Sequence, residues 1–131
     1  MAASNRKQTN NVSLSFKAVT TGNVVVLYCK GRIVFHHEAL ALSRAVGEIL
    51  DRERQIVLDF QDITAIDSAG LGELVSLHMW AEAKEASMKL AGLTSRVRHL
   101  LELTNLSSLF EIYATDKEGL RDSHPKLPEP G

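Results

Sequence analysis

Two short apolar runs separated by an amphipathic stretch limit what this chain can fold into. The runs are Val24 to Cys29 and Gln55 to Phe60. Runs of this length that are apolar on both faces are typical of strands covered on both faces. The stretch between them predicts a helix over about 38–52, because its apolar residues recur at helical spacing: Leu42, Ala45, Val46, Ile49 and Leu50. A helix between two strands predicts a right-handed parallel crossover.

The remaining elements extend this unit at both ends. Residues 13–19 alternate apolar and polar residues before a turn at 20–23, which predicts a strand antiparallel to the first apolar run. After the second run, the patterns predict helices over 71–86 and 96–103, strands over 88–93 and 110–113, and a short helix after Thr115. The expected order is β-β-α-β-α-β-α-β-α. This order predicts an α/β fold with a mixed sheet of four or five strands and helices mainly on one face.

The length and charge of the chain restrict its class. Its 131 residues are enough for one domain, which we expect over 12–120, with a flexible tail at 1–11 and a disordered proline-containing tail at 121–131. A formal net charge of −1 argues against direct nucleic-acid binding. The longest apolar run is far shorter than the roughly 20 residues of a membrane span. The single cysteine, Cys29, excludes an internal disulfide. We therefore expect a cytoplasmic protein that does not cross a membrane.

The strongest candidate for a functional site is Asp67-Ser68-Ala69-Gly70-Leu71-Gly72, where a strand passes into a helix. Sites in open α/β sheets lie beyond the carboxyl ends of strands. A hydroxyl at Ser68 would lie among free backbone N–H groups at the positive end of a helix dipole, which tolerate a phosphoryl group. The two glycines would let a partner approach the backbone closely. The alternative is structural, with Ser68 as an ordinary N-cap residue and the glycines relieving packing.

Enzymatic readings of this segment find little support. Ser68 lacks the glycine two positions earlier that a nucleophile elbow requires. His78, ten residues further along the same predicted helix, could not reach back to serve as its base. The Gly70-Leu71-Gly72 run lacks the third glycine of a dinucleotide-binding fingerprint. This segment therefore gives no sign of a serine hydrolase, and we expect no cofactor.

The other titratable residues show no pattern of a metal or phosphoryl-accepting centre. The histidines have no paired metal-ligand spacing: His36, His37, His78, His99 and His124. An aspartyl-phosphate receiver would need acidic residues after the first buried strand, where this chain has none. We expect Asp59 to be a strand residue near the rim of the sheet and Asp62 to be a turn residue.

The motif and its flanking elements resemble the STAS domain of bacterial anti-sigma factor antagonists. The family pattern is an apolar strand, about six residues, and then Asp-Ser-(Ser/Thr/Ala)-Gly-Leu-Gly, which matches the chain from Ile56 to Gly72. Residues 95–106 resemble the family's third helix, and residues 110–113 its final strand. Gly31, followed by His36 and His37, resembles the loop before the first helix. The resemblance covers about residues 12–120.

This resemblance implies a binding switch and not an enzyme. In the family, an anti-sigma factor with serine-kinase activity phosphorylates the serine that matches Ser68, and a PP2C-type phosphatase removes the phosphate. The unphosphorylated protein binds the anti-sigma factor and so releases a sigma factor. Ala69 leaves Ser68 as the single acceptor in the motif. The alternative within the family is a non-switching STAS subunit of a scaffold or a transporter.

The resemblance also implies where the kinase would bind. Its contacts would lie at Asp67-Ser68-Ala69-Gly70-Leu71-Gly72 and, from the preceding loop, at Gly31, His36 and His37. Many members carry an acidic residue in that loop, and this chain has Arg32-Ile33-Val34-Phe35 instead. The loop contacts are therefore expected to differ from those of most members.

Overall fold

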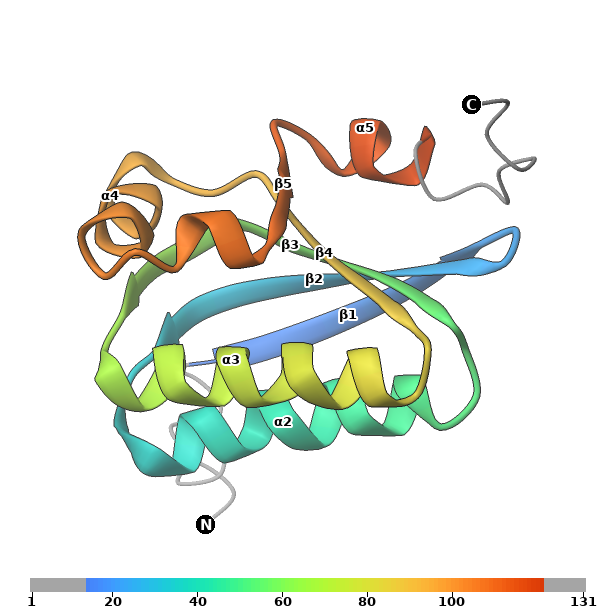
Figure 1. Cartoon of the computed structure of the whole chain (residues 1–131), viewed down its shortest axis with the longest axis horizontal. Helices are drawn as coiled ribbons and strands as arrows, with labels where there is room; N and C mark the ends of the chain where they lie inside the picture. The colour runs from blue at the N-terminus through green and yellow to red at the C-terminus, as the bar shows by residue number, and fades with distance from the viewer. Residues whose placement is uncertain (1–13, 122–131) are drawn as a thin grey trace, which may run out of the picture.

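The computed structural model describes residues 14–121 and contains a five-stranded sheet in the order β1-β2-β3-β4-β5 (Figure 1). β1 (Leu14–Thr21) and β2 (Val24–Ile33) pair antiparallel. The other neighbours pair parallel, through β3 (Gln55–Ile66), β4 (Ser87–Ala91) and β5 (Glu111–Tyr113). The mixed sheet and the element order expected from the sequence are confirmed. The tail predicted at 1–11 and residues 122–131 of the other predicted tail lie outside the described residues.

The parallel strands are joined by three helices, α2 (Phe35–Leu50), α3 (Ser68–Ala83) and α4 (Ser95–Leu103), the last followed by the single turn η1 (Ser107–Leu109). Figure 1 shows α2 and α3 side by side along one face of the sheet, with the short α5 (Asp116–Arg121) on the opposite side. Strand order follows chain order, so right-handed crossovers bring α2, α3 and α4 to the same face. The sequence predicted helices mainly on one face, and this prediction is confirmed.

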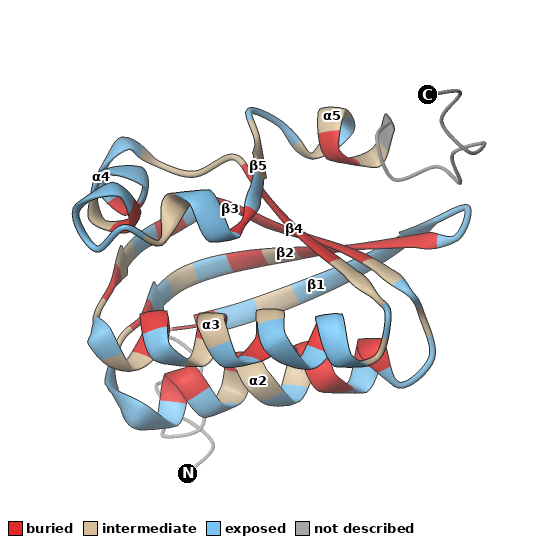
Figure 2. Cartoon of the chain, in the orientation of Figure 1, coloured by how far each residue is buried: buried red, intermediate tan, exposed pale blue. Residues whose placement is uncertain are grey.

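The main core lies between the sheet and these three helices. It joins the central strands to the helices through leucines that are at most 2% exposed: Leu27, Leu58, Leu90, Leu42, Leu74 and Leu101. Figure 2 shows this burial along β2, β3 and β4. Cys29 is buried in the same core, and burial raises the pKa of its thiol, so it acts as a packed apolar residue. Within the described residues, no helix is long and apolar enough to cross a membrane.

β3 is longer than the sequence pattern indicates. Residues 61–66, where a link was expected, continue the strand, so Asp62 is a strand residue and not a turn residue. The pairing of β3 with β2 shifts register twice, first between Tyr28 and Lys30 and then between Gly31 and Arg32. Such bulges interrupt the regular alternation by which strands are recognised in a sequence.

α2 begins earlier than expected, at Phe35 instead of about residue 38. Gly31 consequently lies within β2, and His36 and His37 lie in the first turn of α2. The loop that the resemblance implied before this helix is thus reduced to Val34. Val34 makes no side-chain capping bond, which explains why the helix start carries no local sequence signal.

The opposite face of the sheet carries a smaller core that α5 helps to close. Its buried members are Val24, Val26, Val57 and Ala91. The Tyr28 hydroxyl donates a hydrogen bond of 2.6 Å to Asp116 Oδ2, which attaches the start of α5 to β2. Asp59 pairs in register with Tyr28, is only 2% exposed, and accepts a hydrogen bond from the Gln61 backbone N–H at 3.0 Å. Asp59 is thus a strand residue, as expected, and pairs with Ala91, the last residue of β4, but its side chain is buried.

Burial raises the pKa of Asp59, and the nearby Asp116 and Asp62 carboxylates act in the same direction. Because the folded-state pKa lies above the unfolded value of about 3.9, ionised Asp59 lowers stability. This cost is absent below the unfolded pKa and grows as the pH rises through the folded pKa. We therefore expect Asp59→Asn, which keeps an acceptor for Gln61, to raise the melting temperature at about pH 7 and to leave it nearly unchanged at about pH 3.

Thermal melts of both proteins over this pH range test the prediction. Asp62→Asn is the matched control, because Asp62 is exposed on the same strand and its neutralisation should change the melting temperature much less. A shift for Asp59→Asn that is the same at both pH values would contradict the assignment.

Candidate partner-binding site

Ser68 is the first residue of α3 and lies where β2 and β3 end, with its side chain exposed. The N-cap of α3 is Asp67, whose Oδ1 accepts a hydrogen bond of 3.0 Å from the Gly70 backbone N–H. The alternative in which Ser68 serves as the N-cap residue is therefore wrong. The neighbouring carboxylate performs the capping, so the start of α3 is capped without the Ser68 hydroxyl.

The Asp67 carboxylate caps two helices at once. Its second oxygen, Oδ2, accepts a hydrogen bond of 2.9 Å from the Phe35 backbone N–H at the start of α2. This bond supplies the cap that Val34 lacks. The backbone N–H donors of Phe35 and then Gly70 lower the pKa of Asp67, which is therefore ionised at neutral pH. One side chain thus joins the starts of α2 and α3.

Gly70 lets α3 begin directly against the end of β2. A Cβ at this position would lie 2.4 Å from the Ile33 carbonyl oxygen and 2.7 Å from Cγ1 of Ile66. Gly70 is buried, and Leu71 is buried in the main core. Two of the six motif residues therefore support the site from beneath and present no surface of their own to a partner.

The exposed side of α3 is different in character. Gly72 is exposed, and a Cβ built there would meet nothing within 4 Å. Exposed residues recur along this side at helical spacing, at Ser68, Gly72, Ser76 and Met79. None of the four is charged, and Met79 is 63% exposed. We refer to these four residues as the uncharged strip, which begins at Ser68.

The start of α2 presents exposed rings near this strip. Phe35, His36 and His37 are exposed, and the Phe35 ring stacks on that of His37 with centroids 6.3 Å apart. The Asp67 bond brings this turn to the start of α3. Sequence reasoning singled out both histidines and did not single out Phe35. The signal that could have found it was an aromatic residue directly before two histidines at a helix start.

The other histidines lie away from this site or outside the described residues. His78 packs its ring edge-on against Phe110, at 5.3 Å between centroids, and lies 3.8 Å from Glu82. His99 is exposed on α4, and His124 lies outside residues 14–121. Over that range, no three His, Cys, Asp or Glu side chains are grouped so that they could hold a metal ion.

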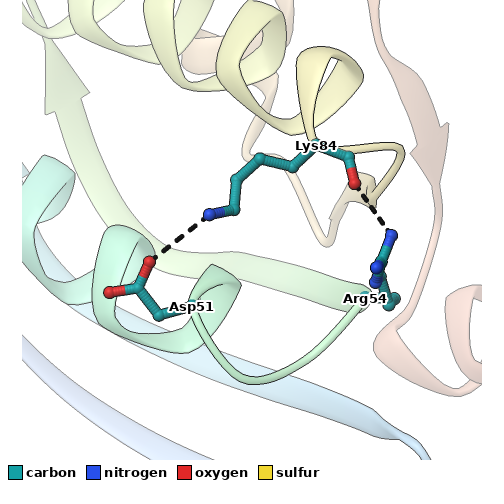
Figure 3. Close-up of polar contacts among 3 residues, drawn as sticks. All are labelled: Asp51, Arg54 and Lys84. Carbon is teal, nitrogen blue, oxygen red and sulfur yellow. Dashed lines mark hydrogen bonds and ion pairs between the residues drawn. The ribbon is translucent and has the colours of Figure 1, made fainter.

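The far ends of α2 and α3 are joined by a separate pair of contacts (Figure 3). Lys84 Nζ lies 3.4 Å from Asp51 Oδ1, and Arg54 donates a hydrogen bond of 2.9 Å to the Lys84 carbonyl oxygen. The two helices are thus connected at both ends, by Asp67 next to Ser68 and by Lys84 at the other end.

The two glycines make a matched test of this geometry. Gly70→Ala places a methyl group against a backbone oxygen and should lower the free energy of unfolding by about 1–3 kcal/mol. Gly72→Ala meets open space in a helix, and should raise it by up to about 1 kcal/mol through helix propensity. Urea denaturation of both variants measures the difference. Equal stability of the two variants would show that the close approach at Gly70 is wrong.

Comparison with known proteins places these observations in a family. A STAS-domain containing protein of Pseudomonas aeruginosa is 36% identical over 59 residues, an alignment that spans 45% of this chain and 58% of that protein. The solved structure of an anti-sigma factor antagonist from Mycobacterium paratuberculosis has a TM-score of 0.75 at 23% identity, covering 84% of this chain and 93% of that one.

A second solved structure is the anti-sigma factor antagonist SpoIIAA in its unphosphorylated form. It has a TM-score of 0.70 at 19% identity and covers 87% of this chain and 100% of its own. At these identities, both structures establish a shared fold. The STAS domain model matches residues 15–119, which is most of the chain. With its five-stranded mixed sheet and its Asp-Ser-Ala-Gly-Leu-Gly helix start, the chain belongs to the STAS domain family.

Proposed function

We propose that this protein is a cytoplasmic anti-sigma factor antagonist whose binding is switched off by phosphorylation of Ser68. In its unphosphorylated form it binds an anti-sigma factor with serine-kinase activity and so releases a sigma factor. The kinase transfers the γ-phosphoryl group of ATP to Ser68 Oγ, releasing ADP and the hydroxyl proton. A PP2C-type phosphatase hydrolyses the phosphoester and restores the binding form.

The observation that carries this proposal is the position of Ser68. Its side chain is exposed at the first residue of α3, and the capping role that often accounts for such a serine belongs to Asp67. The fold shared with proteins named as anti-sigma factor antagonists supports the same role. In this role Ser68 is an acceptor for another protein's chemistry, and the chain itself binds without turnover.

The phosphate acts mainly by its charge. It adds a charge of about −1.5 to −2 at the start of α3. The helix dipole and the backbone N–H groups there favour the dianion, while the adjacent Asp67 carboxylate disfavours it. These opposing effects leave the fold largely unchanged. The consequence falls on the surface, because burying a dianion against a partner without a matched cation is costly.

The partner contacts follow from which motif residues are exposed. We assign the contact to Ser68, Gly72 and the rest of the uncharged strip, together with His36 and His37 at the start of α2. Gly70 and Leu71 contribute by holding α3 in place. A small uncharged surface of this kind fits a transient interface of roughly 800 Å² per partner or less.

Substitutions of Ser68 should separate binding from phosphorylation. Ser68→Ala should bind the kinase as the wild type does and accept no phosphate, which gives a permanently active antagonist. Ser68→Glu should weaken binding by about tenfold, a partial effect because one carboxylate carries about half the charge of the phosphate. Ser108→Glu, on exposed η1, is the matched control and should bind normally. Titration calorimetry measures the affinities.

Peptide mass spectrometry after incubation with the cognate kinase and ATP identifies the modified residue. Phosphate on Thr64 or Ser76 in place of Ser68 would overturn the assignment. Unchanged affinity of Ser68→Glu, together with no phosphate at Ser68 in protein purified from its own cells, would favour a non-switching STAS subunit.

The docking surface can be tested without touching the hydroxyl. Gly72→Glu adds bulk and charge at an exposed helical position, so it should weaken kinase binding by about tenfold or more while leaving the melting temperature within a few degrees. Ser95→Glu adds a carboxylate at the exposed first residue of another helix, α4, and should leave affinity unchanged. Equal affinity of both variants and the wild type would place the interface elsewhere.

A further inference from the structure

We propose that Asp67 is a positioning residue that couples Ser68 to Phe35. Phosphorylation of Ser68 then changes the aromatic surface at the start of α2 as well as the charge at α3. The inference rests on the proposed function, because it names a second surface that the phosphate alters. It is carried by the two hydrogen bonds of Asp67 and by the backbone conformation of Phe35.

Phe35 has an unfavourable backbone conformation. Its φ is 67°, in the left-handed region that bulky residues with a Cβ rarely occupy. Such a conformation persists only where surrounding contacts maintain it. The hydrogen bond from the Phe35 N–H to Asp67 Oδ2, at 2.9 Å, is a contact that does so. The ring contributes little, because Phe35 is 59% exposed and its stacking partner, His37, is exposed as well.

The residues on both sides of this turn are fixed more firmly. Ile33 is fully buried, and its carbonyl oxygen accepts a hydrogen bond from the Asp67 N–H and lies against Gly70. Glu38, one turn into α2, is buried and lies 3.5 Å from His37 Nε2. A change in the Asp67 carboxylate would therefore be confined to the turn that begins at Phe35.

A phosphate on Ser68 would act on this carboxylate directly. It would be attached to the next residue, at the same helix start, and would compete with Asp67 for the backbone N–H groups of α3 while repelling it. Asp67 makes two bonds. The bond to Gly70 caps α3, the helix whose N-cap residue is Asp67 itself, whereas the bond to Phe35 holds an unfavourable backbone conformation at the start of α2. The Phe35 bond is therefore the weaker point. Its loss lets Phe35 relax and shortens α2 at its start.

Amide hydrogen exchange of the full chain, followed by NMR, tests this coupling without any partner protein. Three proteins are compared: the wild type, Asp67→Ser, and the chain with phosphoserine installed at position 68 during translation. Serine can still cap α3 at Gly70, because it is a favoured N-cap residue, but one hydroxyl cannot serve both helices. We expect the Phe35 amide to exchange about ten- to a hundredfold faster in the variant and in the phosphoserine protein. The Leu74 amide, in the buried middle of α3, should be unchanged.

A second variant distinguishes coupling from general loosening. Phe35→Gly removes the unfavourable conformation, because glycine adopts a φ near 67° without steric cost. Phosphoserine at position 68 should therefore accelerate exchange of this amide much less in Phe35→Gly than in the wild type. If Asp67→Ser also loses protection at Leu74, that variant has lost its fold. The comparison between the wild type and Phe35→Gly then decides whether Ser68 and Phe35 are coupled.

Unchanged Phe35 exchange in the phosphoserine protein would overturn the coupling, and so would unchanged exchange in a folded Asp67→Ser. Equal acceleration in the wild type and in Phe35→Gly would also overturn it. These results are independent of the proposed function, since no kinase or anti-sigma factor is present. Failure of Ser68→Glu to weaken partner binding would overturn the proposed function and leave the exchange result standing.

Discussion

The carboxylate of Asp67 accepts hydrogen bonds from the first turns of two helices, and the candidate site depends on this arrangement. With both oxygens used by Phe35 and Gly70, the starts of α2 and α3 are brought to one place at the ends of β2 and β3. The same bonds leave the Ser68 hydroxyl outside the cap, and they lower the pKa of Asp67 so that the carboxylate stays ionised. A single charged group thus fixes the geometry and leaves its neighbour accessible.

The sequence predicted best those elements whose apolar pattern is regular. The strands at 24–29 and 55–60 and the helix stripe that begins at Leu42 follow such patterns, and the structure packs their apolar residues into the two cores. The second half of β3 was missed because its register shifts against β2 break the alternation of side chains. The start of α2 was missed because its cap comes from Asp67, which is distant in sequence, while Val34 provides none.

The candidate site shows the same division between local and distant information. Ser68 was found because the motif is contiguous and its flanking elements are regular. The motif alone could not separate Gly70 from Gly72, because the difference lies in the Ile33 carbonyl oxygen from another strand. Nor could it indicate Phe35, whose importance comes from a backbone angle and a contact with Asp67. Contacts between segments that are distant in the sequence cannot be predicted from the periodicity of apolar residues.

The two sides of α3 explain how a charged modification is compatible with a stable fold. Leu71, Leu74 and Leu77 face the main core and are at most 7% exposed. Ser68 and the rest of the uncharged strip lie on the opposite side of the same helix. A dianion added at Ser68 therefore enters solvent and meets only the Asp67 carboxylate and backbone N–H groups, with no apolar packing to disrupt. Its largest free-energy cost arises when a partner covers that side, so the switch acts on association while the fold outside the first turn of α2 is kept.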